Sequence, residues 1–305
     1  MRLNHLRDFI QIVEAGGIRA AARERGVSQP AVTKALHALE NDLGVRLVHR
    51  TAHGVLLTPS GRAFLSRARA VQSQLAKATE ELAAIAGKTD GNVSFGASAA
   101  GLTLVPDAIK SFQARYPRSY VRIVEGAPRA LLPLLRDETL DFFIGPKPVS
   151  ELTTEFKTRP LFRLPLAVVA RRQHPRRHAT MLDQLAGYPW LLFSSSGWRD
   201  SMLEQAFMAA QIVQPAQIVQ CESYATALAL LTQSDTLGLI PRPEVIHSRL
   251  GPDLTEVAVE GRLPELGFAM YSRADGALTP PARMIMRALI AGARRLAERS
   301  SFQPV

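Results

Sequence analysis

The chain has 305 residues, of which 47% are hydrophobic and 21% charged, a composition typical of a globular protein with room for two domains or more. Lys and Arg outnumber Asp and Glu by 37 to 27, and the single cysteine, Cys221, excludes an internal disulfide and a multi-cysteine metal site. The first residues lack the apolar run of a signal peptide, and no stretch is apolar for long enough to span a membrane. We therefore expect a cytoplasmic protein without a membrane partner.

The positive charge is concentrated in the first quarter of the chain. Residues 1–77 hold 12 Lys and Arg against 5 Asp and Glu, whereas residues 78–305 hold 25 against 22. A basic patch on one small domain is typical of a nucleic-acid binder, because neutralised phosphates release their counterions. The alternative is positive charge that serves only solubility.

Three short helices are predicted first. Apolar residues repeat at helical spacing from 6 to 13 before a Gly-Gly pair, and an alanine-rich helix then ends at Gly26. The third helix lies in GVSQPAVTKALHALENDLG, with Ser28 as its N-cap and Pro30 in its first turn. One face carries Val32, Leu36, Leu39 and Leu43, and the opposite face carries Pro30, Lys34, His37 and Asn41 with Thr33 beside them. On an isolated helix, such an outer face would be read as plain solvated surface.

A small hairpin follows in VRLVHRTAHGVLLT, where Gly54 is free to take a positive φ. Three helices and a hairpin predict a winged helix-turn-helix. In this motif the second helix of the pair enters the major groove, so the outer face of the third helix becomes the candidate for reading bases.

A long helix is predicted from Pro59 to Ala86, with Thr58 as its cap. Its apolar residues alternate by four and three over about three heptads, which favours pairing of two chains in a coiled coil. A helix buried within one core is the alternative. The predicted dimerisation seam consists of Phe64, Ala68, Val71, Leu75, Ala78, Leu82 and Ile85.

The run SQPAVTKALHALENDLGVRLVHR, followed by LTPSG and a long helix, resembles the DNA-binding region of the LysR-type transcriptional regulators. The resemblance implies a winged helix-turn-helix domain (1–58), a linker helix that dimerises (59–88) and a periplasmic-binding-protein-like α/β effector domain (92–305). It also implies a homodimer or homotetramer that binds a double-stranded DNA operator, a small-molecule effector and RNA polymerase, without a cofactor.

The resemblance assigns DNA contacts to Ser28, Gln29, Pro30, Thr33 and Lys34, with Arg50 at the base of the wing; His37 shares their face. The residue types agree, because glutamine can bond adenine, lysine can reach guanine or a phosphate, and threonine can touch a thymine methyl group. One position departs from the family pattern: His53 stands at the wing tip, where an arginine commonly enters the minor groove.

From residue 92 onward, strand and helix patterns alternate in the rhythm of a parallel α/β sheet. Two lobes are predicted, lobe I at about 92–162 and 268–305 and lobe II at about 163–267, joined by crossings near 161–166 and 264–269.

A ligand is expected between these lobes, beyond the carboxyl ends of the strands. Three junctions there offer hydroxyls and free amides, which suit a small oxyanion, and aromatic side chains suggest an aromatic acid. The candidate residues are Ser98, Ala99, Ala100, Lys147, Ser195, Trp198, Arg199, Ser223 and Tyr224. Each serine could instead be only a helix cap, Lys147 a solvated side chain and Trp198 a core residue. Ser98 alone also matches the position at which the family most often places an effector hydroxyl.

Two rival functions use the same features. GASAA at 96–100 approximates the elbow of a serine acyl hydrolase, with Asp235 and His247 in the required order, but the second glycine of the elbow is missing. A solute-binding protein would resemble the C-terminal domain alone. No metalloprotease, P-loop or dinucleotide motif occurs, so we expect a regulator rather than an enzyme, without a metal. The basic run 171–178 is interpreted as a solvated loop.

Overall fold

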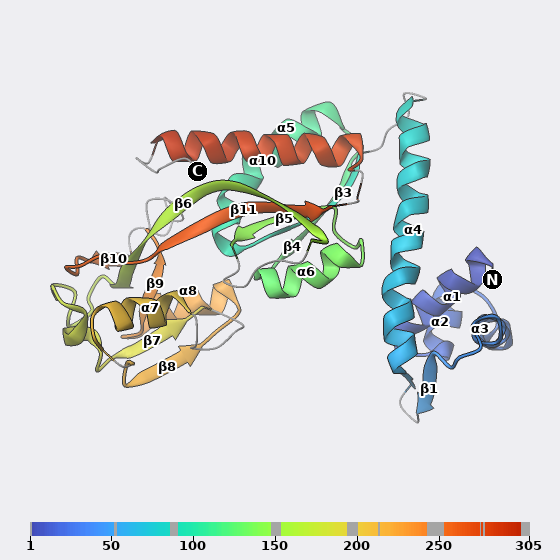
Figure 1. Cartoon of the computed structure of the whole chain (residues 1–305), viewed down its shortest axis with the longest axis horizontal. Helices are drawn as coiled ribbons and strands as arrows, with labels where there is room; N and C mark the ends of the chain where they lie inside the picture. The colour runs from blue at the N-terminus through green and yellow to red at the C-terminus, as the bar shows by residue number, and fades with distance from the viewer. Residues whose placement is uncertain are drawn as a thin grey trace. The chain divides into compact units, whose positions relative to one another are not determined.

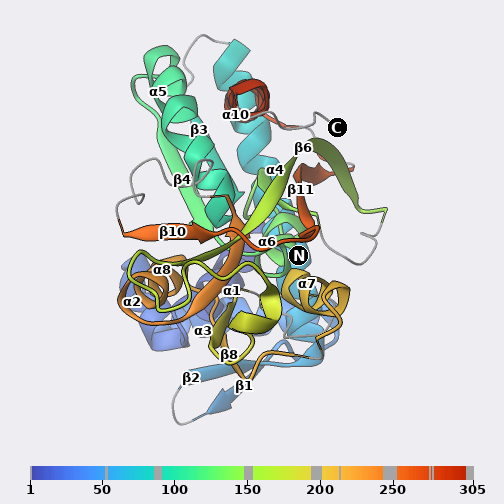
Figure 2. The same cartoon turned by 90° about the vertical axis from the view of Figure 1, so that its left-hand side faces the viewer.

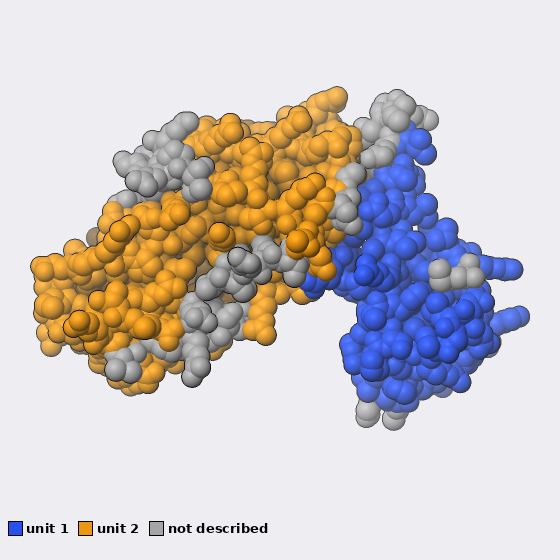
Figure 3. All heavy atoms as spheres, viewed as in Figure 1, with its two compact units in different colours: residues 1–89, 136–139 blue, residues 90–135, 140–305 orange. Residues whose placement is uncertain are grey.

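The computed structural model describes residues 2–51, 54–85, 91–147, 154–193, 201–212, 214–242, 253–274, 276 and 278–299. The chain divides into two compact units (Figure 3). Unit 1 comprises Met1–Thr89 with Arg136–Thr139, and unit 2 comprises Asp90–Leu135 with Leu140–Val305. Among the described residues, no helix has the length and apolarity needed to cross a bilayer.

Unit 1 contains the predicted winged helix-turn-helix and long helix. Its elements are α1 (Leu3–Glu14), α2 (Ile18–Arg25), α3 (Gln29–Leu43), β1 (Val48–Thr51), β2 (Gly54–Leu57) and α4 (Pro59–Ile85). Strands β1 and β2 pair antiparallel as the wing. The buried core takes Phe9 from α1, Ala21 from α2 and Leu36 from α3, so all three helices close on one apolar centre.

Two glycines allow close packing around the wing. Gly54 has φ 138°, and a Cβ there would lie 2.1 Å from the carbonyl oxygen of Gly16. Gly61, in the first turn of α4, would place a Cβ 1.9 Å from the carbonyl oxygen of Leu47. The cap predicted for α4 is confirmed, because Thr58 Oγ1 accepts a hydrogen bond from the Gly61 amide at 2.9 Å.

Unit 2 is an α/β fold built on one continuous path of strands (Figure 1). Its elements are β3 (Asn92–Ala97), η1 (Ala99–Leu104), α5 (Val105–Arg115), β4 (Tyr120–Glu125), α6 (Pro128–Arg136), β5 (Phe142–Pro146), β6 (Phe156–Arg171), η2 (Leu182–Leu185), β7 (Pro189–Leu192), α7 (Met202–Ala209), β8 (Gln217–Gln220), α8 (Tyr224–Gln233), β9 (Leu237–Pro241), β10 (Leu254–Val257), β11 (Glu265–Arg273) and α10 (Pro280–Arg299). The strand order is β4-β3-β5-β11-β6-β9-β7-β8, with β10 paired to β6.

The sheet is mixed, which corrects the expectation of a parallel one. Strands β3, β4 and β5 are parallel to one another, as are β7, β8 and β9. Strands β6, β10 and β11 pair antiparallel with their neighbours. The reason is that β6 and β11 carry the chain from one lobe to the other and back, so they run in opposite directions.

The 16-residue strand β6 changes partners along its length. It pairs with β11 up to Pro165, opposite Glu265, and with β9 from Leu166, opposite Pro241. Figure 1 shows β6 and β11 as two long neighbouring strands that extend from beneath α10 to the region of β9 and β10, with the head of the β11 arrow under α10. The crossing thus lies at residues 165–166.

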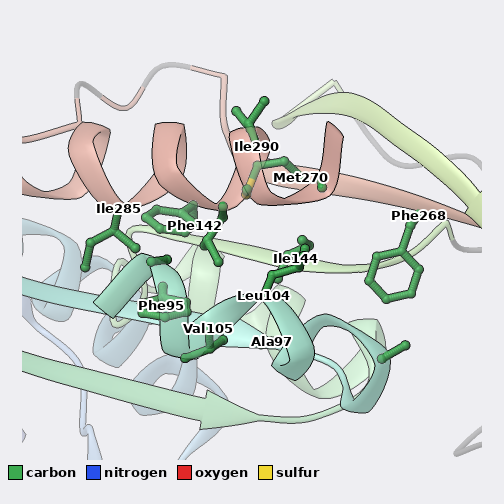
Figure 4. Close-up of a cluster of buried hydrophobic side chains, with 14 of the residues drawn as sticks. Phe95, Ala97, Leu104, Val105, Phe142, Ile144, Phe268, Met270, Ile285 and Ile290 are labelled. Atoms are coloured by element: carbon green, nitrogen blue, oxygen red, sulfur yellow. The ribbon is translucent and has the colours of Figure 1, made fainter. Parts of the chain in front are cut away.

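Separate hydrophobic cores form on the two sides of this crossing. In the first lobe, α5 and α10 lie side by side over one face of the sheet (Figure 2) and cover Phe142, Ile144 and Met270, which Figure 4 shows beneath Ile285 and Ile290. Helix α6 covers the other face through a second cluster. The second lobe has its own core, which includes Trp190, Phe207 and, from the far half of β6, Val168 and Ala170.

His174 ties the loop after β6 to the second lobe. The residue is fully buried, its ring lies 4.7 Å from that of Tyr188, and its Nδ1 accepts a hydrogen bond from the Arg176 amide at 3.0 Å. Its Nε2 lies 3.2 Å from the carbonyl oxygen of Asp235 and therefore donates to it. Burial lowers the pKa of His174 below its ordinary value, because desolvation disfavours the imidazolium.

We predict that unit 2 loses stability as the pH falls below about 6.5, the ordinary pKa of histidine. In that range the unfolded chain binds a proton that folded His174 excludes, so stability rises with pH by up to about 1.4 kcal/mol per unit. Both tryptophans lie in unit 2, so tryptophan fluorescence during urea unfolding reports on it. His174→Gln should flatten the pH dependence, whereas His178→Gln, on the same loop but exposed, should not; equal slopes in wild type and His174→Gln would contradict the prediction.

Candidate DNA interface and effector site

The outer face of α3 is exposed and its inner face is buried, as the sequence predicts. Ser28 caps the helix, its Oγ accepting from the Ala31 amide at 3.4 Å. Val32, Leu36 and Leu39 are at most 1% exposed. The predicted contact residues Gln29, Pro30 and Lys34 are exposed and Thr33 and His37 are half-buried. A helix held by a fully buried face presents its opposite face in a fixed orientation.

A contact from α2 orients the first residue of this face. Arg19 Nε donates a hydrogen bond to Gln29 Oε1 at 3.3 Å. This holds the amide group of Gln29, which has a further lone pair on Oε1 and two donors on Nε2 for a base. Arg19 was not among the predicted site residues. In the sequence, an arginine on a short helix such as Arg19 cannot be distinguished from the other surface arginines.

Buried Glu40 joins α3 to the wing and was also missed by sequence reasoning. It is 4% exposed, and its Oε1 accepts from the amide of Leu47 at 2.8 Å and that of Val48 at 3.4 Å. Its Oε2 pairs with Arg46 Nη1 at 3.1 Å. The position reads as an ordinary polar residue beside the apolar stripe of α3, and only the hairpin that folds back over it makes it buried.

The carboxylate of Glu40 also contacts His37, and His37 in turn contacts Arg50; both were predicted as DNA contacts. His37 Nδ1 lies 3.5 Å from Glu40 Oε2, and Arg50 Nη2 lies 3.3 Å from His37 Nε2. Because arginine can only donate, His37 Nε2 accepts this hydrogen bond, and the ring proton on Nδ1 faces Glu40. The network therefore links the wing strand β1 to the outer face of α3. His53 lies outside the described residues.

The predicted seam of α4 divides into two parts. Phe64 and Ala68 pack into the core of unit 1, and the ring of Phe64 lies 5.6 Å from that of Phe9. Farther along, Val71, Leu75 and Leu82 are 46%, 40% and 68% exposed. Ala78 is also exposed, and the side chain of Ile85 lies outside the described residues. The first two residues thus have a partner within their own chain, and the later part of the seam is an apolar stripe open to solvent.

In unit 2, Ser98 stands at the carboxyl end of β3 with an unsatisfied hydroxyl. It is 7% exposed, and its buried Oγ has no hydrogen-bond partner within the described part of the chain. Its backbone is held in place, because its amide donates to the Ile144 carbonyl at 2.9 Å and its carbonyl accepts from Gly101 at 2.8 Å. A buried hydroxyl without a partner costs about 1–3 kcal/mol, which a ligand that supplies the missing hydrogen bond would recover. Ala99 and Ala100 follow it as the first residues of η1.

Lys147 lies at the end of the adjacent parallel strand β5 and is exposed. Its amide donates to the carbonyl of Gly267 on β11 at 2.7 Å. One residue earlier, the Pro146 carbonyl accepts from the Tyr271 hydroxyl at 3.2 Å, and burial raises the pKa of that tyrosine. The strand ends at β3 and β5 therefore bring Ser98 and Lys147 to the same edge of the first lobe.

The second lobe presents Ser223 and Tyr224 after β8. Ser223 is a helix cap, since its Oγ accepts from the Thr226 amide at 3.3 Å, so the cap interpretation holds here and not at Ser98. Phe193, at the end of β7, meets Tyr224 edge-on with 6.3 Å between ring centres and is 40% exposed. It was not predicted, because only the pairing of β7 with β8 places it there. Ser195, Trp198 and Arg199 lie outside the described residues.

The geometry at Ser98 does not fit a nucleophile elbow. Such an elbow holds its serine in a strained turn, whereas Ser98 has ordinary extended angles of φ −78° and ψ 163°. Asp235, the acid that an acyl hydrolase would use, pairs with Arg171 Nη2 at 2.7 Å. His247 lies outside the described residues.

Comparison with known proteins agrees with this geometry in both units. Residues 3–62 match the family described as "Bacterial regulatory helix-turn-helix protein, lysR family", and residues 86–294 match the "LysR substrate binding domain". The chain belongs to the LysR family of bacterial transcriptional regulators. It is 30% identical to the HTH-type transcriptional regulator TdcA of Escherichia coli K12, over 79% of this chain and 77% of that protein.

Other members of the LysR family resemble the chain over nearly its whole length. It is 28% identical to the HTH-type transcriptional regulator PcaQ of Agrobacterium fabrum, over 95% of this chain and 94% of that protein. The crystal structure of CbnR, a LysR family transcriptional regulator, has a TM-score of 0.70 and 23% identity, covering 97% of this chain and 99% of that one. As a LysR-type regulator, the chain binds DNA and a small-molecule effector and forms oligomers.

We predict that Glu40→Gln lowers the free energy of unfolding of unit 1 by about 1–3 kcal/mol, because an amide cannot accept the Leu47 hydrogen bond and pair with Arg46 as the carboxylate does. Urea unfolding followed by far-UV circular dichroism measures the change. Glu24→Gln, which alters the charge equally on an exposed part of α2, should stay within about 0.5 kcal/mol of wild type. An unchanged Glu40→Gln midpoint would remove the proposed link between α3 and the wing.

Proposed function

We propose that α3 reads the operator in the major groove through Gln29, Thr33 and Lys34, while Ser28 and Pro30 at its start approach the phosphate backbone. The observation that carries this assignment is the exposure of this face on a helix whose other face is at most 1% exposed at Val32, Leu36 and Leu39. The polar side chains on it match the edges of adenine, thymine and guanine. The basic balance of residues 1–77 supplies the phosphate attraction.

The wing assists through Arg50 and His53 in this proposal. Arg50 stands on β1 and contacts His37 at 3.3 Å, so its guanidinium is placed beside the reading face. A guanidinium at this place is suited to a phosphate, which would bind it with charge-assisted hydrogen bonds. His53 replaces the usual arginine at the tip, so contact with the minor groove depends on a weaker, titratable cation.

The effector that we propose is a small anion, bound between the lobes by Ser98. Ser98 is supported by its buried hydroxyl, which has no hydrogen-bond partner among the described residues, and Ala99 and Ala100 add the amides of a helix start. Lys147 contributes a positive charge from the same edge. From the second lobe, Ser223 retains a hydroxyl proton to donate, and Tyr224 with Phe193 offers an aromatic wall for an aromatic acid. Ser195, Trp198 and Arg199 complete the proposed site.

Effector binding would act on the DNA-binding units by changing the relative orientation of the two lobes, and with them the contacts between subunits. In this proposal the α4 stripe of Val71, Leu75, Ala78, Leu82 and Ile85 pairs two chains, and two such dimers form a tetramer. The protein acts in the cytoplasm on promoter DNA, beside RNA polymerase, and has no catalytic activity. The unstrained backbone of Ser98 supports that last point.

We predict that Lys34→Ala weakens operator binding by about 1–3 kcal/mol, because it removes one base or phosphate contact from the reading face. Fluorescence anisotropy at fixed salt concentration measures the affinity, with the operator first located by genome-wide mapping of bound sites. Lys110→Ala, the same change of charge on α5 of unit 2, serves as the control. Unchanged affinity in Lys34→Ala would remove this residue from the interface.

A matched pair of variants tests the effector site. Ser98→Ala should leave the stability of the ligand-free protein unchanged or raise it, because it deletes a buried hydroxyl that has no hydrogen-bond partner among the described residues. Ser223→Ala should lower stability by about 0.5–2 kcal/mol through loss of the α8 cap.

A thermal-shift screen of small organic acids on the full-length protein then identifies a ligand. Ser98→Ala should weaken its binding about tenfold, the effect of one lost hydrogen bond in a closed site. A confirmed effector that bound Ser98→Ala with wild-type affinity would contradict the role of Ser98.

A further inference from the structure

A cavity of about 510 Å³ lies in the second lobe, between the loop that follows β6 and strand β10. The loop contributes Arg172, Arg177, His178 and Thr180, and the β10 side contributes Thr255 and Glu256. None of these residues belongs to the effector site proposed above. The volume falls in the range of about 300–1,000 Å³ in which proteins hold small-molecule ligands.

The lining carries more positive than negative charge. Its acidic residue, Glu256, is paired with Arg242 Nη2 at 3.4 Å, so that carboxylate already has a counter-charge. Arg177 is exposed, and in the described part of the chain its guanidinium has neither an ion pair nor a side-chain hydrogen bond. With Arg172 on the same wall, two guanidinium groups face a cavity that also offers the hydroxyls of Thr180 and Thr255. Guanidinium and hydroxyl donors are the groups that bind carboxylate and phosphate oxygens.

The walls of the cavity are fixed by hydrogen bonds that do not use the lining side chains. Buried His174 holds the base of the loop by accepting from the Arg176 amide, and the Arg177 amide donates to the His174 carbonyl at 3.1 Å. The Arg172 amide donates to the Asp253 carbonyl at 2.9 Å, and the Glu260 amide donates to the Thr180 carbonyl at 2.6 Å. Both sides of the cavity are thereby tied together. A preformed site loses less conformational entropy when a ligand binds.

We propose that this cavity is a second anion site, which binds a small organic anion through its carboxylate or phosphate group to Arg177 and Arg172. The site is independent of the effector site at Ser98. Since its walls are the loop that follows β6 and strand β10, which pairs with β6, a bound anion joins the loop and β10 by further contacts. Because β6 also runs through the first lobe, the site adjoins the end of the strand that connects both lobes.

The test is isothermal titration of the full-length protein with citrate and with inorganic phosphate, at constant ionic strength. Wild type should show saturable binding of at least one probe. Arg177→Gln and Arg172→Gln should each weaken it about tenfold or more, because each removes a charge-assisted contact. Arg176→Gln is the matched control: it lies on the same loop, is exposed, carries the same charge and does not line the cavity. The affinity of Arg176→Gln for the probe should stay within about twofold of wild type.

The outcomes separate this site from the other proposals. The component of probe binding that depends on Arg177 should persist in Ser98→Ala, so loss of the effector site leaves this result unaffected. Binding that Ser98→Ala abolishes and Arg177→Gln spares would assign the probe to the effector site and overturn the second site. If neither probe shows saturable binding, the second site is overturned. It is also overturned if Arg176→Gln weakens binding as much as Arg177→Gln does, because that result indicates only diffuse attraction of the anion to the loop.

Discussion

The strand pairing at Pro165 and Leu166 is the constraint on which unit 2 depends. At this point β6 leaves β11 and takes β9 as its partner, so one continuous strand belongs to two hydrophobic cores. A strand buried in both cores cannot slip by one residue without turning its apolar side chains to the opposite face. The crossing therefore fixes the register of both lobes, and with it the strand ends that carry the candidate effector residues.

The candidate effector site combines one unsatisfied group with otherwise saturated surroundings. Around Ser98, the backbone hydrogen bonds to Ile144 and Gly101 are complete, and the neighbouring strand end is clamped to β11 by the amide of Lys147. In the described part of the chain, the hydroxyl of Ser98 has no hydrogen-bond partner. The backbone of such a site is held rigid by hydrogen bonds, while one polar group is left to bond the ligand. This arrangement is expected of a receptor that is preorganised for its ligand.

In the DNA-binding unit, a buried charged residue connects the wing to α3. Glu40 holds the start of β1 through two backbone amides and contacts Arg46 and His37, so the orientation of the wing follows that of α3. A buried carboxylate is stabilising only when such partners surround it. Helix α3 and the wing consequently hold the residues predicted to contact DNA as one body rather than as two independent elements.

The sequence by itself determined the three helices, the hairpin and the long helix of unit 1 in their order, because helix periodicity, caps and breaking glycines are local signals: Ser28 and Thr58 cap their helices as expected, and Gly54 takes a positive φ. It also determined the exposed face of α3 and singled out Ser98. Tertiary structure decided what depends on residues far apart in the chain. It placed Phe64 and Ala68 of the seam in the core of unit 1, made β6 and β11 antiparallel, and buried Glu40 beneath the hairpin. It also left the Ser98 hydroxyl without a hydrogen-bond partner among the described residues. Burial and pairing are properties of contacts between distant segments, and no local pattern specifies which segments will meet.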